Sequence, residues 1–363
     1  MRVTHFVARG FATGYINFFQ KYMGEYDNTF VIVPHLERDT FPLKFMNNDE
    51  IVYVNSCRTI RFQKNIRKIL EKSDVVIFSG LFEWRVGFSL LPKKILRKTF
   101  VHFWGGDFYG FRNKPSTIRG MLSRKLTYKA LKEAGGFIFL IDGEYEKFKE
   151  ITNITNDDYI ARMPNNPFKE VNYEEYITEK DSNDEIKILL GNSAAPTNHT
   201  EDILPKLKDY VGIKVYCPLA YGDDEYRNKI IRLGKMLLGD RFIPITEFVD
   251  KKEYVEFLSG MDVGIFNHDR QQSMGNINIM LALGKKVYLR PGTSMWTNYK
   301  KQGWDIYSVD ALDNVTLGEL ISIDEKKRQE NIEISRKINE HHFVDTKAAW
   351  DKILRSVGEC GNS

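Results

Sequence analysis

The sequence predicts an α/β protein of two domains, each with a parallel sheet covered on both faces by helices. Its 363 residues exceed one ordinary domain and suit two domains of about 150–200 residues. Short apolar runs rich in β-branched and aromatic residues alternate with helix-like stretches, a pattern typical of parallel sheets. The alternation is interrupted once by an acidic, apolar-poor segment and then restarts. We therefore expect two Rossmann-like domains that face a cleft.

The first domain is expected at residues 1–165, where six runs predict strands. These runs are THFVA from Thr4, TFVIVP from Thr29, IVYVN from Ile51, DVVIFSG from Asp74, TFVHFWGG from Thr99 and GFIFLID from Gly136. Three basic runs have helix-compatible spacing of their apolar residues. They are RFQKNIRKILEK from Arg61, LLPKKILRKTF from Leu90 and STIRGMLSRKLTYKALK from Ser116. We expect them on the outside of this domain.

The polar segment 166–185 predicts an interdomain linker, and the second domain is expected at residues 186–343. Five strand-like runs follow the linker: IKILLGN from Ile186, GIKVYCP from Gly212, RFIPIT from Arg241, MDVGIFN from Met261 and KKVYLRP from Lys285. The last stretch, from Asp324, predicts two helices. The second of them, at residues 344–358, is expected to pack on the first domain.

Composition narrows the class of protein. Hydrophobic residues make up 42% and charged residues 28% of the chain, which excludes a disordered or low-complexity protein. Cys57, Cys217 and Cys360 are far apart and odd in number, so they predict neither a disulfide framework nor a cysteine-bound zinc. No run approaches the ~18 apolar residues of a spanning helix, and no secretory signal is recognised at the N-terminus. A soluble or peripheral protein in the reducing cytoplasm is expected.

The net charge of +4 is unevenly distributed. Residues 1–165 hold 26 Lys and Arg against 17 Asp and Glu, whereas the remaining residues hold 27 against 32. Between Arg58 and Lys132, 18 basic residues accompany four acidic ones. Basic amphipathic helices can lie on an anionic membrane, although ordinary solvated helices are the alternative. Clustering in one domain favours the membrane surface, while the lack of a recognisable nucleic-acid motif disfavours nucleic acid.

Ligands of open parallel sheets bind beyond the carboxyl ends of the strands, so the loops there are the candidate sites. The loop NHDRQQS follows a strand that ends at Phe266 and leads into a helix with an apolar inner face. Free N–H groups at such a helix start, together with an arginine and amide donors, suit a diphosphate. The residues expected here are Asn267, Arg270, Gln271, Gln272, Gly275 and Asn276. A solvent-exposed turn is the alternative.

A second loop follows the first strand of the second domain. It begins with Gly191, Asn192 and Ser193, and the next helix is expected to be capped near Asn198 or Thr200. A glycine directly after the strand lets a ligand approach the backbone. The loop lacks both the G-x-G-x-x-G and the G-x-x-x-x-G-K-[ST] patterns, so NAD binding is weakly supported and a Walker-type phosphate loop is excluded. An ordinary β–α turn is the alternative.

A third candidate lies in the first domain, within VHFWGGDFYGF (residues 101–111). Two glycines before Asp107 form a tight bend that would place this carboxylate where it can act as a general base. An aspartate that caps the following turn is the alternative. Glu83, in the neighbouring loop FSGLFEWR, is the second candidate base.

Several other chemistries are disfavoured by spacing. The seven histidines form no H-E-x-x-H or H-x-E arrangement, so a catalytic metal is not expected. No G-x-S-x-G elbow of a nucleophilic hydrolase is present. His5, inside the apolar first strand, is expected to be a core residue. We therefore expect neither a metal nor a cofactor.

These segments together resemble a known family. ILLGNSAAPTNHTEDIL, FVDKKEYVEFLSGMDVGIFNHDRQQSMGNINIMLALGKKVYL, HFWGGDFY and VVIFSGLFEW are similar to the dTDP-N-acetylfucosamine:lipid II N-acetylfucosaminyltransferases of glycosyltransferase family 56. The resemblance runs from about residue 50 to residue 345. It implies a GT-B fold and a dTDP- or UDP-sugar donor held mainly by the second domain. It also implies a polyprenyl-diphosphate-linked acceptor at the cytoplasmic membrane face, in the assembly of surface glycans such as O-antigen or enterobacterial common antigen.

Carried onto this chain, the resemblance assigns the donor diphosphate to the loops at residues 191–193 and 270–276. It places Thr246, Glu247 and Phe248 beside the base or ribose, and Trp104, Gly106 and Tyr109 on the acceptor side. The expected reaction is metal-independent transfer of a hexose, with Asp107 or Glu83 as the base if configuration inverts.

Two other functions are compatible with these residues. A nucleotide-sugar 2-epimerase would use carboxylates and a histidine around the sugar, for which His268, Glu247 and Asp269 are available. A non-catalytic nucleotide-sugar-binding module would bind the donor without turnover.

Overall fold

The computed structural model describes residues 1–9, 12–32, 43–54, 60–164, 172–177, 185–248 and 251–360. The chain divides into two compact units. Unit 1 comprises Met1–Lys169 and His341–Ser363, and unit 2 comprises Glu170–Glu340. Most of the expected linker, residues 166–185, lies outside the described residues.

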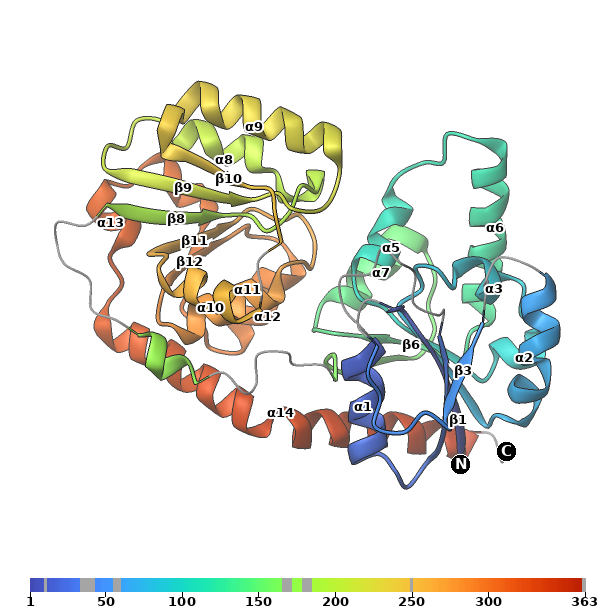
Figure 1. The fold of residues 1–363 in the computed structure, drawn as a ribbon. Helices are drawn as coiled ribbons and strands as arrows, with labels where there is room; N and C mark the ends of the chain where they lie inside the picture. The colour runs from blue at the N-terminus through green and yellow to red at the C-terminus, as the bar shows by residue number, and fades with distance from the viewer. Residues whose placement is uncertain are drawn as a thin grey trace. The chain divides into compact units, whose positions relative to one another are not determined.

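Unit 1 is built on a parallel sheet whose described strands have the order β3-β2-β1-β4-β5-β6-β7 (Figure 1). The strands are β1 (Arg2–Val7), β2 (Asp27–Ile32), β3 (Ile51–Tyr53), β4 (Val75–Ser79), β5 (Thr99–His102), β6 (Gly136–Phe139) and β7 (Asp158–Ile160). The six predicted strands are confirmed. The sequence missed β7 because this three-residue edge strand carries exposed residues at both ends and no buried apolar run.

Helices surround the sheet of unit 1. They are α1 (Ala12–Tyr22), α2 (Ile60–Lys72), α3 (Arg85–Ser89), α4 (Lys93–Leu96), α5 (Gly106–Tyr109), α6 (Ile118–Glu133) and α7 (Glu144–Thr152). Neighbouring strand residues enter different cores, with Phe6 in one and Val7 in the other, so both faces of the sheet are buried. Of the basic runs, those from Arg61 and Ser116 form α2 and α6. The run from Leu90 forms only the four-residue α4, because the chain enters β5 at Thr99.

Unit 2 repeats this architecture, and its described strands have the order β10-β9-β8-β11-β12-β13. The strands are β8 (Ile186–Leu190), β9 (Ile213–Pro218), β10 (Phe242–Ile245), β11 (Val263–Phe266), β12 (Lys286–Leu289) and β13 (Tyr307–Ser308). The helices are α8 (Thr200–Leu207), α9 (Asp224–Leu238), α10 (Lys251–Ser259), α11 (Met274–Ala282), α12 (Ser294–Lys301) and α13 (Leu317–Ile321). The five predicted strands are confirmed, and the two-residue β13 was missed.

The C-terminal stretch forms one continuous helix, α14 (Glu325–Cys360), so the prediction of two helices is wrong. The sequence holds no proline in this stretch and no glycine before Gly358, so no residue breaks the helix. The helix begins in unit 2 and ends in unit 1, where Trp350, Ile353 and Leu354 are buried in the core. In the part of the chain that the structure describes, no helix is long and apolar enough to span a bilayer.

Candidate functional site

The main candidate site lies at the carboxyl edge of the sheet of unit 2. There β8 and β11 are hydrogen-bonded neighbours, so the loops that follow them emerge side by side. Gly191, at the end of β8, adopts a left-handed backbone with φ of 71°, and its N–H donates to the Ile265 carbonyl (2.9 Å). An added Cβ would lie 3.0 Å from Asn198 Oδ1, so both backbone and space favour glycine here. The sequence had identified both loops as donor-binding.

Asn198 organises the first loop. Its Oδ1 accepts from the N–H of Asn192 (3.1 Å) and from Nε2 of His268 (2.8 Å), and its Nδ2 donates to the Ser193 carbonyl (3.0 Å). The cap of α8 lies near Asn198 and Thr200, as predicted, but neither of them is the capping residue. The capping position is His199, in a left-handed conformation and without a side-chain cap bond. Asn198 instead holds the shape of the loop, and this role depends on its hydrogen bond with His268, 70 positions away in the sequence.

Gln272 joins the two loops directly. Its Nε2 donates to Asn192 Oδ1 (2.8 Å), and its Oε1 accepts from the Thr197 hydroxyl (2.7 Å). The expected diphosphate donors Gln271 and Gln272 are both buried. Because the amide of Gln272 is engaged within the protein, this residue braces the loops. Among the described atoms, Gln271 Oε1 has no hydrogen-bond partner, so its amide group could reorient toward a ligand.

A third loop, after β9, contributes Tyr221, which was not selected from the sequence and which extends the surface of the predicted residue Phe248. Gly222 lets this loop lie against the loop that follows β8, because a Cβ at Gly222 would lie 2.6 Å from the backbone of Ala194. The Tyr221 hydroxyl accepts from Asn192 Nδ2 (2.9 Å), and its ring stacks on Phe248 at 5.9 Å between centroids with planes 9° apart. Both rings are exposed. The available signal was an aromatic residue three positions after the end of a strand.

Thr246 and Glu247, the other residues expected near the base or ribose, are exposed in the segment that carries Phe248 after β10. Together, these residues and Tyr221 place polar groups beside a stacked aromatic pair. Such a surface can stack a nucleobase and contact a ribose hydroxyl.

Positive charge lies next to this aromatic pair. The Arg270 guanidinium is half-buried, and its Nη1 donates to the Gln271 carbonyl (3.0 Å). Desolvation of its hydroxyl raises the pKa of Tyr221, although the ring edge is exposed, and the charge of Arg270 opposes that rise. The start of α11 follows, with Gly275 exposed and Asn276 donating from Nδ2 to the Tyr254 hydroxyl (2.8 Å). A guanidinium and a helix N-terminus in one loop can bind an anion.

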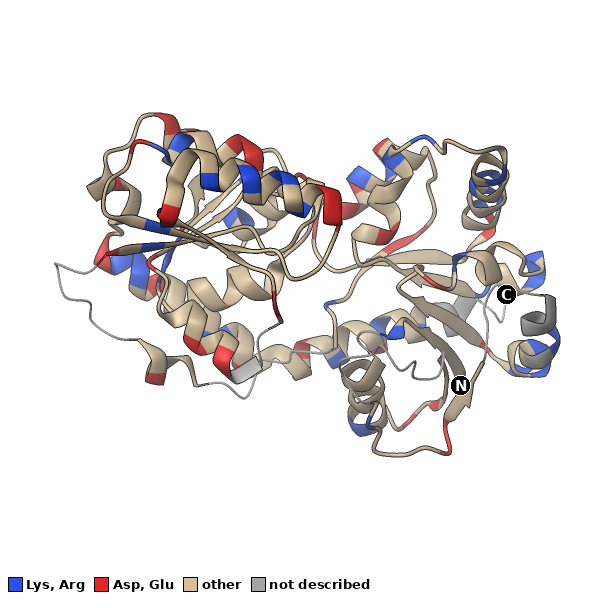
Figure 2. Ribbon diagram, turned by 45° about the horizontal axis from the view of Figure 1, so that its top comes forward, with Lys and Arg blue, Asp and Glu red and all other residues tan. Residues whose placement is uncertain are grey.

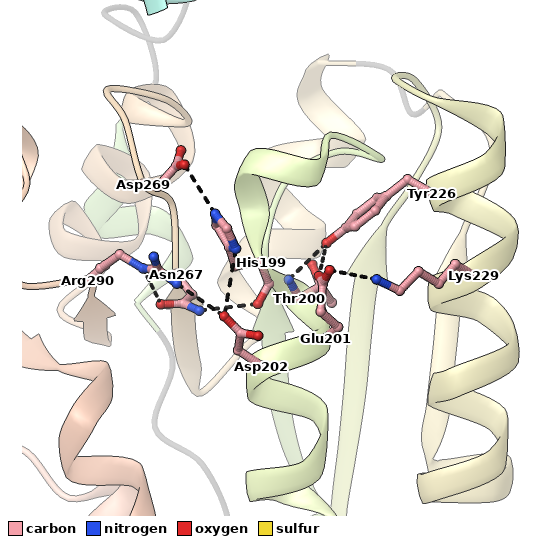
Figure 3. A network of polar contacts seen from close by, with 9 residues as sticks. All are labelled: His199, Thr200, Glu201, Asp202, Tyr226, Lys229, Asn267, Asp269 and Arg290. Atoms are coloured by element: carbon pink, nitrogen blue, oxygen red, sulfur yellow. Dashed lines mark hydrogen bonds and ion pairs between the residues drawn. The ribbon is translucent and has the colours of Figure 1, made fainter. Parts of the chain in front are cut away.

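Asn267 has a different surrounding from the one expected for a ligand-binding residue. It is buried, its Nδ2 donates to the His199 carbonyl (3.2 Å), and its Oδ1 accepts from Arg290 Nε (2.9 Å). Arg290 also forms an ion pair with Asp202 (3.2 Å), as Figure 3 shows. Asn267 therefore connects β11, α8 and β12 from inside. Arg290, which the sequence analysis did not select, lies directly after a strand.

The residues considered for an epimerase do not gather around one open position. His268 is fully buried, and burial lowers its pKa to about 3, so it is neutral at physiological pH. Asp269 contacts His199 (3.2 Å), which also lies 3.7 Å from Asp202 (Figure 3). In the same figure the Tyr226 hydroxyl of α9 accepts from the Thr200 N–H and donates to Glu201, both at the start of α8. These groups stabilise the β8–α8 loop.

The two candidate bases lie at the carboxyl edge of the sheet of unit 1. Asp107 accepts from two separate loops, with Trp104 N–H on Oδ1 (3.0 Å) and Leu81 N–H on Oδ2 (3.0 Å). Burial raises the pKa of Asp107 to about 6, against the opposing effect of these donors. Glu83 Oε1 accepts from the Arg9 N–H (2.9 Å). Both carboxylates therefore have fixed positions beyond β1, β4 and β5.

The residues expected on the acceptor side have different surroundings. Trp104 is half-buried and tilts against Phe82, an exposed ring 5.7 Å away that was not selected from the sequence. Gly106 is the first residue of α5. Tyr109 is only 5% exposed and its hydroxyl donates to Glu144 (2.7 Å), so its side chain belongs to the core instead. The Phe82–Trp104 pair is the aromatic surface beside Asp107.

Two units of parallel sheet with interleaved helices, with polar loops at the carboxyl edges, define a protein of the GT-B fold. The chain matches the family model described as 4-alpha-L-fucosyltransferase, glycosyl transferase group 56, over residues 14–356. It therefore belongs to glycosyltransferase family 56. The resemblance recognised in the sequence is confirmed at the level of the family.

Solved structures share the fold at low sequence identity. WaaG, a glycosyltransferase involved in lipopolysaccharide biosynthesis, has a TM-score of 0.62 at 10% identity, covering 98% of this chain and 99% of that chain. A UDP-forming trehalose-phosphate synthase from Burkholderia xenovorans has a TM-score of 0.66 at 9% identity, with 98% and 99% coverage. Sucrose-phosphate synthase from Thermosynechococcus elongatus has a TM-score of 0.61 at 9% identity, with 99% and 98% coverage.

Proposed function

We propose that the protein transfers a hexose, a deoxyamino sugar such as N-acetylfucosamine, from a dTDP- or UDP-sugar to a glycan on polyprenyl diphosphate. The transfer would occur at the inner face of the cytoplasmic membrane, in the assembly of a bacterial surface polysaccharide of the O-antigen or common-antigen type. The observation that carries the proposal is the connection of three loops at one sheet edge of unit 2 through Asn192, with Gln272 on one side and Tyr221 on the other. Family membership favours a transferase over an epimerase or a non-catalytic module.

Two surfaces of these loops would bind different parts of the donor, one the base and the other the diphosphate. The exposed Tyr221–Phe248 pair offers a stacking surface for a pyrimidine base. Arg270 and the start of α11 offer a bidentate donor and backbone N–H groups to the diphosphate. Gly191 lets Asn198 pack against the end of β8, which fixes the loop that carries Asn192. These groups are held in place by the hydrogen bonds of three buried side chains, Gln272, Asn198 and Asn267.

The chemistry follows from where charge develops. As the bond to the sugar C1 breaks, negative charge accumulates on the departing nucleotide diphosphate. Preorganised donors such as Arg270 and a helix N-terminus stabilise that charge without a metal ion. In unit 1, Asp107 has a pKa of about 6, so it is mostly ionised at neutral pH and can accept the proton of the acceptor hydroxyl. Glu83 is the second candidate, and a retaining reaction would need neither.

The experiment that tests the donor site is a thermal-shift and calorimetric panel of dTDP, UDP, GDP and ADP without added metal. We expect selective stabilisation by dTDP or UDP. Arg270→Ala removes a charge-assisted contact to phosphate, so it should weaken that binding by roughly ten- to a hundredfold. Arg232→Ala, at an exposed position of α9, is the matched control and should bind like the parent.

Two results would contradict this assignment. The first is equal nucleotide affinity in the parent and Arg270→Ala proteins, which would remove Arg270 from the donor site. The second is a strict requirement for Mg²⁺ or Mn²⁺, tested by titrating EDTA, which would overturn metal-independent transfer.

A further inference from the structure

Helix α6 carries an exposed apolar surface that no described part of the chain covers. Four large apolar side chains lie within its first nine residues: Ile118 (82% exposed), Met121 (52%), Leu122 (58%) and Leu126 (37%). Their spacing of three, four and eight positions from Ile118 places them on one side of the helix. Isolated exposed apolar residues are ordinary, but a contiguous group indicates contact with another surface.

Basic residues extend this apolar surface along the same helix. Lys125, Lys129 and Lys132 are exposed, and their spacing places them on the side that carries Ile118. Residues 108–132 contain seven Lys and Arg and no Asp or Glu. Glu133, the acidic residue of α6, forms an ion pair with Lys93 (2.9 Å). We call the four apolar residues and these three lysines the α6 face. Figure 2 shows Lys and Arg along this helix.

The second half of α6 attaches the helix to unit 1. Thr127, Ala130 and Leu131 are its buried residues, and the Thr127 hydroxyl hydrogen-bonds to Ser89 Oγ (2.9 Å). Before Thr127 the helix has no buried residue, and Figure 1 shows its first turns extending away from the sheet. Thr117 caps the start by accepting from the Gly120 N–H (3.1 Å). The first turns are thus a capped helix whose large apolar side chains stay exposed.

The topology places these turns at the carboxyl edge of the sheet of unit 1, where the two candidate bases lie. Helix α6 ends at Glu133 and the chain enters β6 at Gly136, so the end of the helix lies at the amino edge of the sheet. Its start therefore lies at the carboxyl edge, where Asp107 is found on α5. The connection between α5 and α6 is short, and Arg124 fastens it by donating to the Gly110 carbonyl (3.4 Å).

We propose that the α6 face docks unit 1 onto an anionic lipid bilayer. Ile118, Met121, Leu122 and Leu126 would enter the boundary between headgroups and acyl chains, while the lysines contact lipid phosphates. A nucleic acid would use the lysines but would leave the exposed apolar group without a role. The inference rests on the proposed function in one respect, since a lipid-linked acceptor would reach Asp107 from the same surface.

The test measures binding of the full chain to vesicles of mixed phosphatidylglycerol and phosphatidylcholine, and to vesicles of phosphatidylcholine alone. The parent protein should bind the anionic vesicles, with a decrease on adding salt. Replacing Ile118, Met121 and Leu122 with Ser should weaken binding by about tenfold or more. Lys125→Gln with Lys129→Gln should weaken it by roughly ten- to thirtyfold.

Matched controls separate this surface from exposed residues in general. Val211→Ser, Met236→Ser and Val344→Ser change three exposed apolar residues outside α6, and Lys235→Gln changes an exposed lysine of α9. These variants should bind vesicles like the parent. The thermal midpoint and the nucleotide-induced shift should be unchanged in the α6 variants, since the donor loops lie in unit 2.

The outcomes distinguish this inference from the proposed function. Vesicle binding that depends on α6, without any nucleotide binding, would support docking and contradict the donor site. Nucleotide binding with no vesicle binding, or with vesicle binding that the α6 variants retain, would overturn docking alone. Self-association that the Ser variant abolishes, with no vesicle binding, would assign the face to a second copy and also overturn the proposal.

Discussion

At the scale of single residues, Asp107 experiences two opposing effects. Its burial favours the neutral acid, while backbone N–H groups from Trp104 and Leu81 favour the carboxylate. The result is a pKa raised to about 6, close to the range in which a general base works well at neutral pH. The same hydrogen bonds hold two loops together, so Asp107 combines a positioning role with its proposed catalytic one.

The general-base assignment predicts both a mutant phenotype and a pH profile. Asp107→Asn should lower turnover by about 10²–10⁴-fold and leave nucleotide binding intact. In the parent, kcat/KM should rise with pH, level off above about 7 and fall roughly tenfold per pH unit below 6, because only the ionised carboxylate accepts a proton. Steady-state kinetics across pH provide the measurement.

The asparagine amide would face a backbone N–H with its own N–H₂ group, so the variant's thermal midpoint must be compared with the parent's. If a folded Asp107→Asn protein keeps near-normal turnover, the base is a different group. Glu83→Gln would then be the next variant to measure.

At the scale of elements, the single helix α14 contributes residues to both units. Near its start, Asn331 exchanges hydrogen bonds with the backbone of Asp305 (2.8 and 3.0 Å) in unit 2. Near its end, Asp351 accepts from the Tyr26 hydroxyl (2.9 Å), and Lys347 pairs with Glu25 and Asp351 in unit 1. The helix is thus hydrogen-bonded within unit 2 and packed into the core of unit 1.

The docking of α14 on unit 1 depends mainly on Trp350. Its ring is fully buried, 5.2 Å from His102 and 6.1 Å from Tyr15 between centroids. Trp350→Ala should lower the free energy of unfolding by about 3–5 kcal/mol, since it removes a large side chain and leaves a cavity. Val344→Ala, at an exposed position of the same helix, should change it by under about 0.5 kcal/mol. Urea unfolding measures both, and a loss below about 1 kcal/mol for Trp350→Ala would refute this docking.

At the scale of the whole molecule, buried histidines make stability depend on pH. His5, whose prediction as a core residue is confirmed, contacts the Tyr15 hydroxyl (3.0 Å) and Asn28 (3.1 Å). Burial lowers the pKa of His5 and of His102 in unit 1, and of His268 in unit 2, to about 3. The unfolded chain binds these protons near pH 6.5, so protonation favours unfolding as the pH falls below that value.

The sign and size of the effect follow from these values. Each histidine should lower the free energy of unfolding by about 1.4 kcal/mol for each pH unit that the pH falls between 6.5 and 3. Asp107 acts in the opposite direction, because its raised pKa lets the folded state bind a proton first, between pH 6 and 4. Unit 1 should therefore lose at least about 2 kcal/mol of stability from pH 7.5 to pH 5.

Urea unfolding at a series of pH values measures this dependence. His5→Asn should remove one histidine's share of the slope, whatever it does to stability at pH 7.5. A stability that does not fall between pH 7.5 and 5 would show that burial does not lower the pKa of these histidines.

Much of the fold was predictable because burial leaves a local pattern. Strands such as β4 and β11 are buried at every residue and read as short apolar runs between helical segments. The edge strands β7 and β13 were missed because they are short and only partly buried. The candidate loops were also predictable, since ligands of parallel sheets bind beyond the carboxyl ends of the strands.

The sequence by itself determined the alternation of strands and helices, the loops that carry polar groups and the family to which the chain belongs. Only the tertiary structure decided which of those groups face solvent and which support others. Gln272, Asn267 and Tyr109 looked like ligand-binding residues, yet each is buried against residues of other elements. Tyr221, which was not selected from the sequence, is exposed beside the donor loops. The physical reason is that local periodicity reports burial along one element, whereas a side chain's partners depend on contacts between elements distant in the sequence.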